Sequence, residues 1–476
     1  MATREKTSRK DSRKSAAERE LRIGPGPTRS ELLAAGKKLR ETCPRSSHAA
    51  WKAPADRRDP VELMDSANAG RIPELIPIRH GRMLRSPFTF YRGAALNMAA
   101  DLASTPATGM RVQACGDAHL MNFGAFATPE RRLVFDINDL DETLPAPWEW
   151  DVKRLAASIV LASRSNGFSE ADGRDATIAT VRSYREHMAE YSEMPTLAVW
   201  YASIPIEFLE AALKDKDARE RQKKALARAR ARSAVEHDFP KLAAIAGTQP
   251  RIKDNPPLIY HPQDEAVDEH LKRSRGAFAE YRESLQEDRR VLIDRYDFKD
   301  IAIKVVGVGS VGTLCAVILM MASAEDPLFL QVKEARTSVL EPYAGASLHQ
   351  NRGQRVVNGI RLMQSASDIF LGWTTGKLGR HLYVRQLRDM KIGAQVELFT
   401  PGVLTQYAEF CGWSLARAHA RSGSPAQITG YLGKGDTFDE AIADFSIAYA
   451  DQTERDHEVL MKAARAGRIE LATEPE

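Results

Sequence analysis

The 476-residue sequence contains only four cysteines, and no two of them form a C-x-x-C pair. A disulfide framework and a zinc knuckle are therefore not indicated, and free thiols fit a reducing cytoplasm. Long apolar runs are missing as well, since the longest, Leu314 to Ala322, is far shorter than the roughly 20 residues of a membrane-spanning helix. The charged start of the chain lacks the apolar stretch of a signal peptide. We therefore expect a cytoplasmic protein with no membrane span.

Charge is close to balanced, with 68 Lys and Arg against 64 Asp and Glu and a net charge of +4. So small an excess does not favour a nucleic-acid partner. The chain is 43% hydrophobic and 28% charged, which is enough to bury a large core. We expect one bilobed unit or two domains.

The sequence divides into a tail and three further parts. Residues 1–30 mix Arg, Lys, Ser and Glu and then reach a Gly-Pro-Gly-Pro run, which predicts a disordered basic tail. Helical periodicity dominates 57–297, β-branched residues gather in 298–390, and helical periodicity returns over 391–468. We expect a helical region that carries the catalytic and metal-binding loops, then a β-rich nucleotide-binding region, then returning helices.

The most informative segment runs from Asp117 to Asn122 and is followed, fourteen residues after the Asn, by Asp136 at the end of a short apolar run. Phosphoryl transfer needs an Asp that accepts or orients the hydroxyl proton, and an Asn and a second Asp that hold Mg²⁺. The pattern predicts Asp117 as the catalytic residue and Asn122 and Asp136 as metal ligands. Asp139 is a further candidate ligand close behind, and His119 either steadies the loop by hydrogen bonding or takes part directly.

A G-x-G-x-x-G run supplies Gly307, Gly309, Ser310 and Gly312 as candidate phosphate-binding residues, and Lys333 follows at the end of a predicted strand. A lysine in this place would contact the α and β phosphates of ATP as a point charge. The expected elements are strand, glycine turn, strand, strand with lysine, helix, strand and strand, which is the order of a kinase amino-terminal lobe. In an ordinary kinase this lobe precedes the catalytic loop, so the reversed order predicts a circular permutation.

The glycine run also fits a dinucleotide-binding fold, and an NAD-type oxidoreductase is therefore an alternative. Leu314 to Ala322 would then be the first helix, and Glu334 would bind a ribose. The segment is apolar on every side and contains β-branched residues, which favours a strand. The alternative also leaves Asp117 and Asp136 without a role, so we prefer the kinase-like interpretation. A non-catalytic nucleotide-binding pseudokinase is a third hypothesis.

The segment from Cys115 to Asn122 resembles the H-G-D-x-H-x-x-N loop of aminoglycoside and choline phosphotransferases, with Cys115 in place of the first His. Asp136 and Asp151 are similar to the metal-binding Asp and to the helix-capping Asp that braces the loop in those enzymes. Leu415 to His419 resembles the helix that directly precedes their catalytic loop. The resemblance implies an α+β, bilobed protein-kinase-like fold in circularly permuted order. It also implies ATP and Mg²⁺ as cofactors, and transfer of phosphate, or of a nucleotidyl group, to a small-molecule or protein acceptor.

The region from about 57 to 460 also resembles an uncharacterised bacterial family called domain of unknown function 2252, a name that supplies no activity. The matching segments are Gly116 to Gly124, Phe135 to Glu142, Glu149 to Leu155, Gln331 to Ala335 and Tyr383 to Met390. One feature departs from kinases, whose lysine pairs with a helix Glu. The expected helix, Arg352 to Ser367, contains no acid. The candidate partners for the lysine are then Glu334, Glu341 and Asp368.

Overall fold

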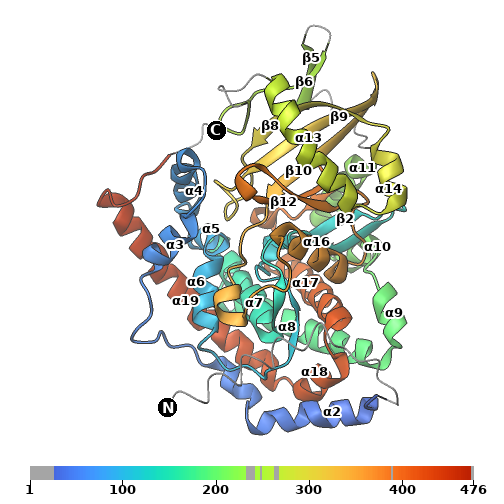
Figure 1. Ribbon diagram of the computed structural model, residues 1–476. Coiled ribbons are helices and arrows are strands. Elements are labelled where there is room, and N and C mark those ends of the chain that lie inside the picture. The colour runs from blue at the N-terminus through green and yellow to red at the C-terminus, as the bar shows by residue number, and fades with distance from the viewer. Residues whose placement is uncertain (1–25, 232–241, 247–248, 262–266, 388–389, 473–476) are drawn as a thin grey trace, which may run out of the picture.

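The computed structural model describes residues 26–231, 242–246, 249–261, 267–387 and 390–472 (Figure 1). The fold is α+β, with helices predominating. A six-stranded sheet occupies one end of the molecule and a helical region the other (Figure 1). The predicted tail lies almost entirely outside the described residues, and the first described helix begins at Arg29.

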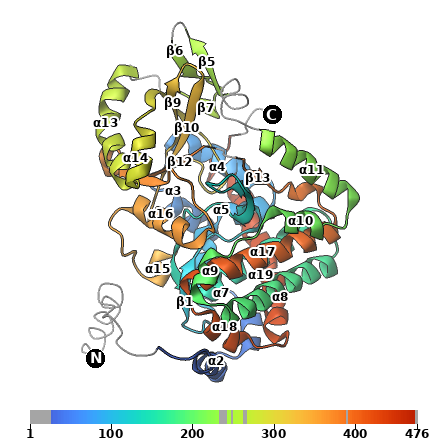
Figure 2. The ribbon, with the colours of Figure 1, turned by 90° about the vertical axis from the view of Figure 1, so that its right-hand side faces the viewer.

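Four long helices form the centre of the helical region. They are α7 (Trp148–Ser165), α8 (Glu170–Glu193), α17 (Pro401–Ser422) and α19 (Thr437–Arg465). Helix α7 is buried on all sides from Trp148 to Ser163, which explains why its sequence is apolar over more than one face. Helices α8 and α17 pack along each other although they come from distant parts of the chain (Figure 2).

Shorter helices surround this centre. Before α7 these are α2 (Arg29–Lys38), α3 (Pro60–Asn68), α4 (Ile76–Met83), α5 (Pro87–Gly93) and α6 (Ala95–Leu102). After α8 come α9 (Thr196–Tyr201), α10 (Ile206–Ala212), α11 (Lys216–Ala231) and, near the end of the chain, α18 (Pro425–Leu432). Within the described residues, no helix is both long and apolar enough to cross a bilayer.

The six-stranded sheet is antiparallel throughout, in the order β11-β12-β10-β9-β8-β7. Its strands are β7 (Ile259–Tyr260), β8 (Asp297–Lys304), β9 (Cys315–Ser323), β10 (Asp326–Glu334), β11 (Gly372–Thr375) and β12 (His381–Gln386). Helices α13 (Val267–Ser284), α14 (Glu287–Ile293) and α16 (Arg352–Met363) accompany it, with the single-turn helix α15 (Glu341–Ala344). In β10, Lys333 stands opposite Cys315 of β9 and Tyr383 of β12.

Two small sheets position the loops of the helical region. Strand β1 (Arg111–Ala114) pairs with β4 (Leu144–Pro147), and β13 (Ile392–Gly393), β2 (Phe123–Ala127) and β3 (Leu133–Ile137) form a second sheet. A separate hairpin is made by β5 (Ala243–Ala246) and β6 (Gln249–Ile252). The segment Asp117–Asn122 thus lies between β1 and β2, directly beside β3.

The segment that a dinucleotide-binding fold would need as its first helix is strand β9, in an antiparallel sheet, as its β-branched residues predict. The structure corrects the expected cap of α7, because the helix already begins at Trp148 and Asp151 is not its N-cap. Asp368 lies before β11, and its carboxylate accepts the backbone N–H groups of Phe370 and Gln386.

Candidate functional site

A cavity of about 320 Å³ lies where three distant segments meet. One wall is the segment with Asp117, His119 and Asn122, the second runs from Asp139 to Glu142, and the third is the glycine turn with Gly307, Gly309 and Ser310. The structure therefore brings together residues that helices α7 to α14 separate in the sequence. Further residues of the lining are Arg71, Arg79, Arg92, Glu334 and Arg336.

Asp117 faces this cavity with 22% of its side chain exposed. Its carboxylate accepts two hydrogen bonds from the buried guanidinium of Arg154 on α7, one of them from Nε at 2.7 Å. The amide Nδ2 of Asn122 donates to the backbone oxygen of Asp117 at 2.8 Å. This bond leaves the amide oxygen of Asn122 for another partner. A carboxylate held in one orientation by Arg154 is suited to positioning a substrate hydroxyl.

The turn before Asp117 is held by Asp151. Its carboxylate accepts the N–H groups of Cys115 at 2.5 Å and Gly116 at 2.9 Å, and it lies 3.1 Å from Nε2 of His419 on α17. Gly116 has a φ of +80°, and an added Cβ would lie 2.6 Å from the carbonyl oxygen of Glu142. Only glycine fits this turn without displacing the backbone beside it. Asp151 therefore braces the segment, although it caps no helix.

His119 lies beside Asp117, with its Nε2 3.9 Å from a carboxylate oxygen. Burial lowers the pKa of His119 to about 4, despite the opposing effect of Asp117. The imidazole is therefore neutral at pH 7. Its Nδ1 is buried without a hydrogen-bond partner, so within the described structure the ring does not anchor the loop through that atom.

Lys333 joins the sheet to the loop after β3. Its Nζ lies 3.4 Å from both carboxylate oxygens of Asp139 and also bonds to the carboxylate of Asp141. Burial lowers the pKa of Lys333, but these two carboxylates raise it well above its usual value. Burial and repulsion by Asp139 raise the pKa of Asp141, whereas Lys333 and Arg385 outweigh burial and lower that of Asp139. Lys333, Asp139 and Asp141 thus form a cluster in which one positive side chain contacts two acidic ones.

The observed partners replace those predicted for Lys333. Glu334 accepts the N–H of Leu314 and pairs with Arg380, Glu341 accepts the N–H of Ser338, and Asp368 caps the turn before β11. Helix α16 has no acid and contributes Arg355 instead. Its guanidinium donates to the backbone oxygens of Thr143, Asp141 and Arg336.

Asp136, which the sequence suggests as a metal ligand, does not line the cavity. Its side chain is fully buried and forms an ion pair of 2.6 Å with Arg417 of α17, whose side chain is also fully buried. It also accepts the N–H of Ser365 at 2.7 Å and the hydroxyl at 2.8 Å. These contacts occupy the carboxylate of Asp136 and give it a structural role. The acids of this segment that line the cavity are Asp139, Asp141 and Glu142, and the side chain of Asp139 is 35% exposed.

Two glycines of the turn, Gly307 and Gly309, line the cavity, and the third, Gly312, packs against the helical region. Gly307 has a φ of +70°, and an added Cβ at Gly309 would meet the carbonyl oxygen of Arg92 at 3.2 Å. Gly312 does not line the cavity. Its φ is +84°, its carbonyl accepts the N–H of Ile72, and an added Cβ would touch the side chain of Arg71. The turn is therefore packed against the helices of the other region.

Sequence analysis did not single out Arg154, Arg71, Arg336 or Arg385. Arg154 carried a detectable signal, because it and Lys153 place charge in an apolar stretch of the helix, shortly after Asp151. No local sequence pattern marks the other three arginines, and only the tertiary structure shows where they lie. Asp141 stands two positions after Asp139 in the sequence, but its contact with Lys333 spans 192 positions.

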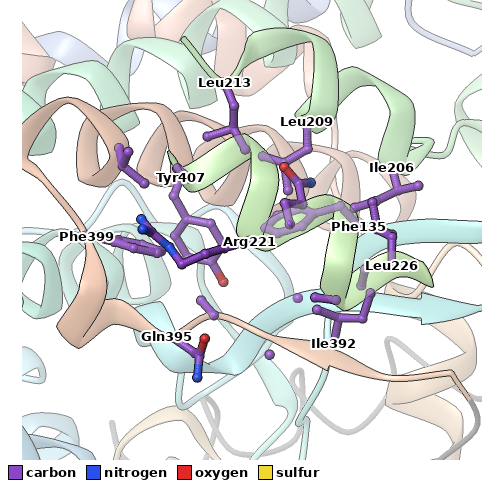
Figure 3. A pocket seen from close by; sticks show the side chains of 18 of the residues that line it. Phe135, Ile206, Leu209, Leu213, Arg221, Leu226, Ile392, Gln395, Phe399 and Tyr407 are labelled. Atoms are coloured by element: carbon purple, nitrogen blue, oxygen red, sulfur yellow. The ribbon is translucent and has the colours of Figure 1, made fainter. Parts of the chain in front are cut away.

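Two further cavities differ in character. One of about 650 Å³ is lined by Asn138, Gln331, Arg385 and Leu387, so consecutive residues Asn138 and Asp139 line neighbouring spaces. The other, of about 130 Å³, lies behind β2 and β3 and is lined by Phe135, Leu209, Leu226 and Tyr407 (Figure 3). It contains no carboxylate, so the chemistry expected from the sequence belongs to the first cavity and not to this apolar one.

No group of three or more His, Cys, Asp or Glu side chains converges on a metal position in the described ranges. The available hard ligands at the cavity are Asp139, Asp141 and the amide oxygen of Asn122. Carboxylate and amide oxygens suit Mg²⁺, which takes few protein ligands and keeps water or substrate phosphates in its remaining positions. The donor set therefore fits an ion that arrives together with a nucleotide.

The chain belongs to the bacterial family described as "Uncharacterized protein conserved in bacteria (DUF2252)", which matches residues 71–463. The match includes the segment from Asp117 to Asn122, the glycine turn and Lys333. No curated protein and no solved structure matches the chain.

Proposed function

We propose that this chain is an ATP-dependent phosphotransferase that uses Mg²⁺ to transfer the γ phosphate to a hydroxyl group. The proposed architecture is a protein-kinase-like fold in permuted order, with the six-stranded sheet as the nucleotide-binding lobe. The observation that carries the proposal is the contact of Lys333 with Asp139, 3.4 Å apart across 194 positions of sequence. In kinases, a strand lysine and a metal-binding Asp both act on the nucleotide phosphates.

The residues around the cavity have complementary roles in this proposal. Lys333 contacts the α and β phosphates, and the backbone of the glycine turn covers them. Asp139 and Asn122 hold Mg²⁺, which neutralises charge on the β and γ phosphates when it is bound. The cavity that contains Gln331 and Arg385 lies along the same strand as Lys333 and receives the base.

Asp117 orients the acceptor hydroxyl and accepts its proton. The hydroxyl oxygen forms a bond to the γ phosphorus, the bond from that phosphorus to the β–γ bridging oxygen breaks, and ADP leaves. Lys333 moves from Asp139 to the phosphates as the nucleotide enters, which frees the carboxylate. The ammonium group of Lys333 thus pairs with Asp139 before the nucleotide binds and with its phosphates afterwards.

Nucleotide binding tests the class of protein. Calorimetric titration with ATP and with NAD, each with and without Mg²⁺, is expected to show binding of ATP that strengthens with Mg²⁺. NAD is expected not to bind. Binding of NAD that is indifferent to Mg²⁺ would contradict the proposal.

A matched pair of variants tests the metal site. Asp139→Asn is expected to abolish most Mg²⁺-dependent turnover while the fold persists, because Asp141 still pairs with Lys333. Asp136→Asn leaves Arg417 buried and unpaired, so we expect it to lower the free energy of unfolding by roughly 3–5 kcal/mol. Loss of turnover in a stable Asp136→Asn protein, with normal turnover in Asp139→Asn, would reverse the assignment.

Asp117→Asn tests catalysis separately from binding. We expect transfer to fall by roughly 10² to 10⁴-fold while ATP affinity persists, whereas Lys333→Ala weakens ATP binding. The substitution also leaves Arg154 without its carboxylate, so unfolding is measured in parallel. An equal loss of ATP affinity in the two variants would favour a binding module over an enzyme.

A further inference from the structure

Four arginines line the cavity and bond only to neutral groups. Arg71 and Arg336 each donate to the carbonyl oxygen of Ala67 at 3.0 Å. Arg79 is 1% exposed and donates to Asn68 Oδ1 and to the carbonyl oxygen of Gly93. Arg92 lies over the ring of Phe88 at 6.0 Å.

The lining also contains five carboxylates, those of Asp117, Asp139, Asp141, Glu142 and Glu334. None of these four arginines forms an ion pair with a carboxylate among the residues that the structure describes. Burial and the neighbouring Arg79 and Arg336 lower the pKa of Arg71. The Nε atoms of Arg79 and Arg92 are buried without a hydrogen-bond partner. A buried cation without a charged partner is costly, and an anion bound in the cavity would supply that partner.

The acidic side chains nearby are already engaged. Glu142 accepts the N–H of Val339 at 2.8 Å, and Glu334 pairs with Arg380 at 2.9 Å. Asp65 offsets part of the lowering at Arg79, and Glu142 and Glu334 do so at Arg71. Asp117 is paired with Arg154 and acts on Arg92 only from beyond ion-pair distance. Asp139 and Asp141, the other two carboxylates of the lining, pair with Lys333. Within the described residues, the five carboxylates thus have other partners, and none forms an ion pair with one of the four arginines.

We propose that the four arginines bind a phosphate or carboxylate group of the acceptor, so that the acceptor is a hydroxyl compound with negative charge. This inference rests on the proposed function. Arg92 and Asp117 line the same cavity, so an anion held by Arg92 can present a neighbouring hydroxyl to Asp117. Choline and aminoglycosides are cations, and an arginine-lined cavity repels them. The chain thus differs in substrate charge from the enzymes that its loop resembles.

Inorganic phosphate tests the anion site without any turnover. We expect saturable binding of phosphate to the full chain by calorimetry, and a loss of roughly 10- to 100-fold in Arg92→Gln and in Arg336→Gln, as for charge-assisted hydrogen bonds. Arg361→Gln is the matched control, because Arg361 also donates to a backbone carbonyl but does not line this cavity. Equal phosphate affinity in all four proteins would overturn the site.

The same titration in the presence of saturating Mg²⁺ and ATP distinguishes the two sources of an anion. Phosphate that still binds when ATP is present supports a site for the acceptor. Competition between phosphate and ATP, together with weaker ATP binding in Arg92→Gln, assigns the arginines to the nucleotide and overturns the acceptor assignment.

A charge series of acceptors completes the test, with glycerate, glycerol and choline offered as hydroxyl compounds. We expect transfer to glycerate to exceed transfer to the other two, and Arg92→Gln to lower kcat/KM for glycerate by roughly tenfold or more. Preference for choline would overturn the inference while leaving the kinase proposal intact. Failure of ATP to bind would instead contradict the proposed function and leave the phosphate result standing.

Discussion

His119 illustrates how burial, helped by the neighbouring Arg92 and Arg154, lowers the pKa of a side chain beside Asp117. Only 4% of the residue is exposed, and its pKa falls from 6.5 to about 4. Because the folded pKa lies below the unfolded one, the unfolded chain binds the proton first. The contribution of neutral His119 to stability is therefore complete above pH 6.5 and is lost as the pH falls towards 4.

His119→Gln should flatten this part of the pH dependence. We expect the wild-type protein to lose free energy of unfolding between pH 6.5 and 4 more steeply than the variant, because the variant has no imidazole to protonate. Urea unfolding at a series of pH values measures the difference. Parallel curves for the two proteins would mean that the pKa of His119 is the same in the folded and unfolded states.

Residue periodicity predicted the helices and strands that depend on local sequence. The β-branched residues around the glycines identified β8, β9 and β10, and Val356 to Met363 identified α16. The choice between Asp136 and Asp139 was not accessible in this way. Asp136 lies near the end of β3 and Asp139 lies just beyond it. Arg417, which forms the ion pair with Asp136, comes 281 positions later. Ligand assignment within a short acidic run thus depends on long-range packing.

Helix α11 offers a second element whose sequence conceals a tertiary feature. Its charged residues predict an exposed helix, and one face nevertheless covers the apolar cavity of Figure 3 with Ala218, Gln222 and Leu226. Both amide atoms of Gln222 are buried without a hydrogen-bond partner. An unsatisfied amide against apolar surface destabilises the folded state.

Gln222→Leu should therefore stabilise the protein, by about 1 kcal/mol, since it replaces unpaired polar atoms with an apolar group of similar size. Gln222→Glu is the matched control and should lower stability, because it places a charge in the same position. Denaturant unfolding of both variants measures whether each substitution raises or lowers the free energy of unfolding. A destabilised Gln222→Leu protein would show that the amide has a partner in solution.

For the whole molecule, the order of segments makes the sheet region an insertion between two parts of one helical region. Helix α17 packs along α8, and its Arg417 and His419 hold Asp136 and Asp151. The helical region therefore has no complete core until the end of the chain is present. Local sequence patterns cannot reveal this dependence, because the paired residues lie on opposite sides of the sheet region.

A chain that ends at residue 398 should fail to fold cooperatively. It lacks α17, so Asp136 loses its cation and an apolar face of α8 is exposed to water. We expect rapid proteolysis and loss of a sigmoidal unfolding curve, both partly restored when residues 399–476 are added as a separate fragment. Cooperative unfolding of the shortened chain alone would contradict this dependence.

The pairing of Asp136 with Arg417 also bears on protein synthesis. A ribosome that adds about 5–20 residues per second takes roughly 14 to 56 s to translate the 281 positions between them. Throughout that interval the nascent chain carries the segments of Asp136 and Asp151 without the support of α17. Completion of the site is thereby coupled to completion of translation, and chaperones have a long period in which to bind the uncovered face of α8.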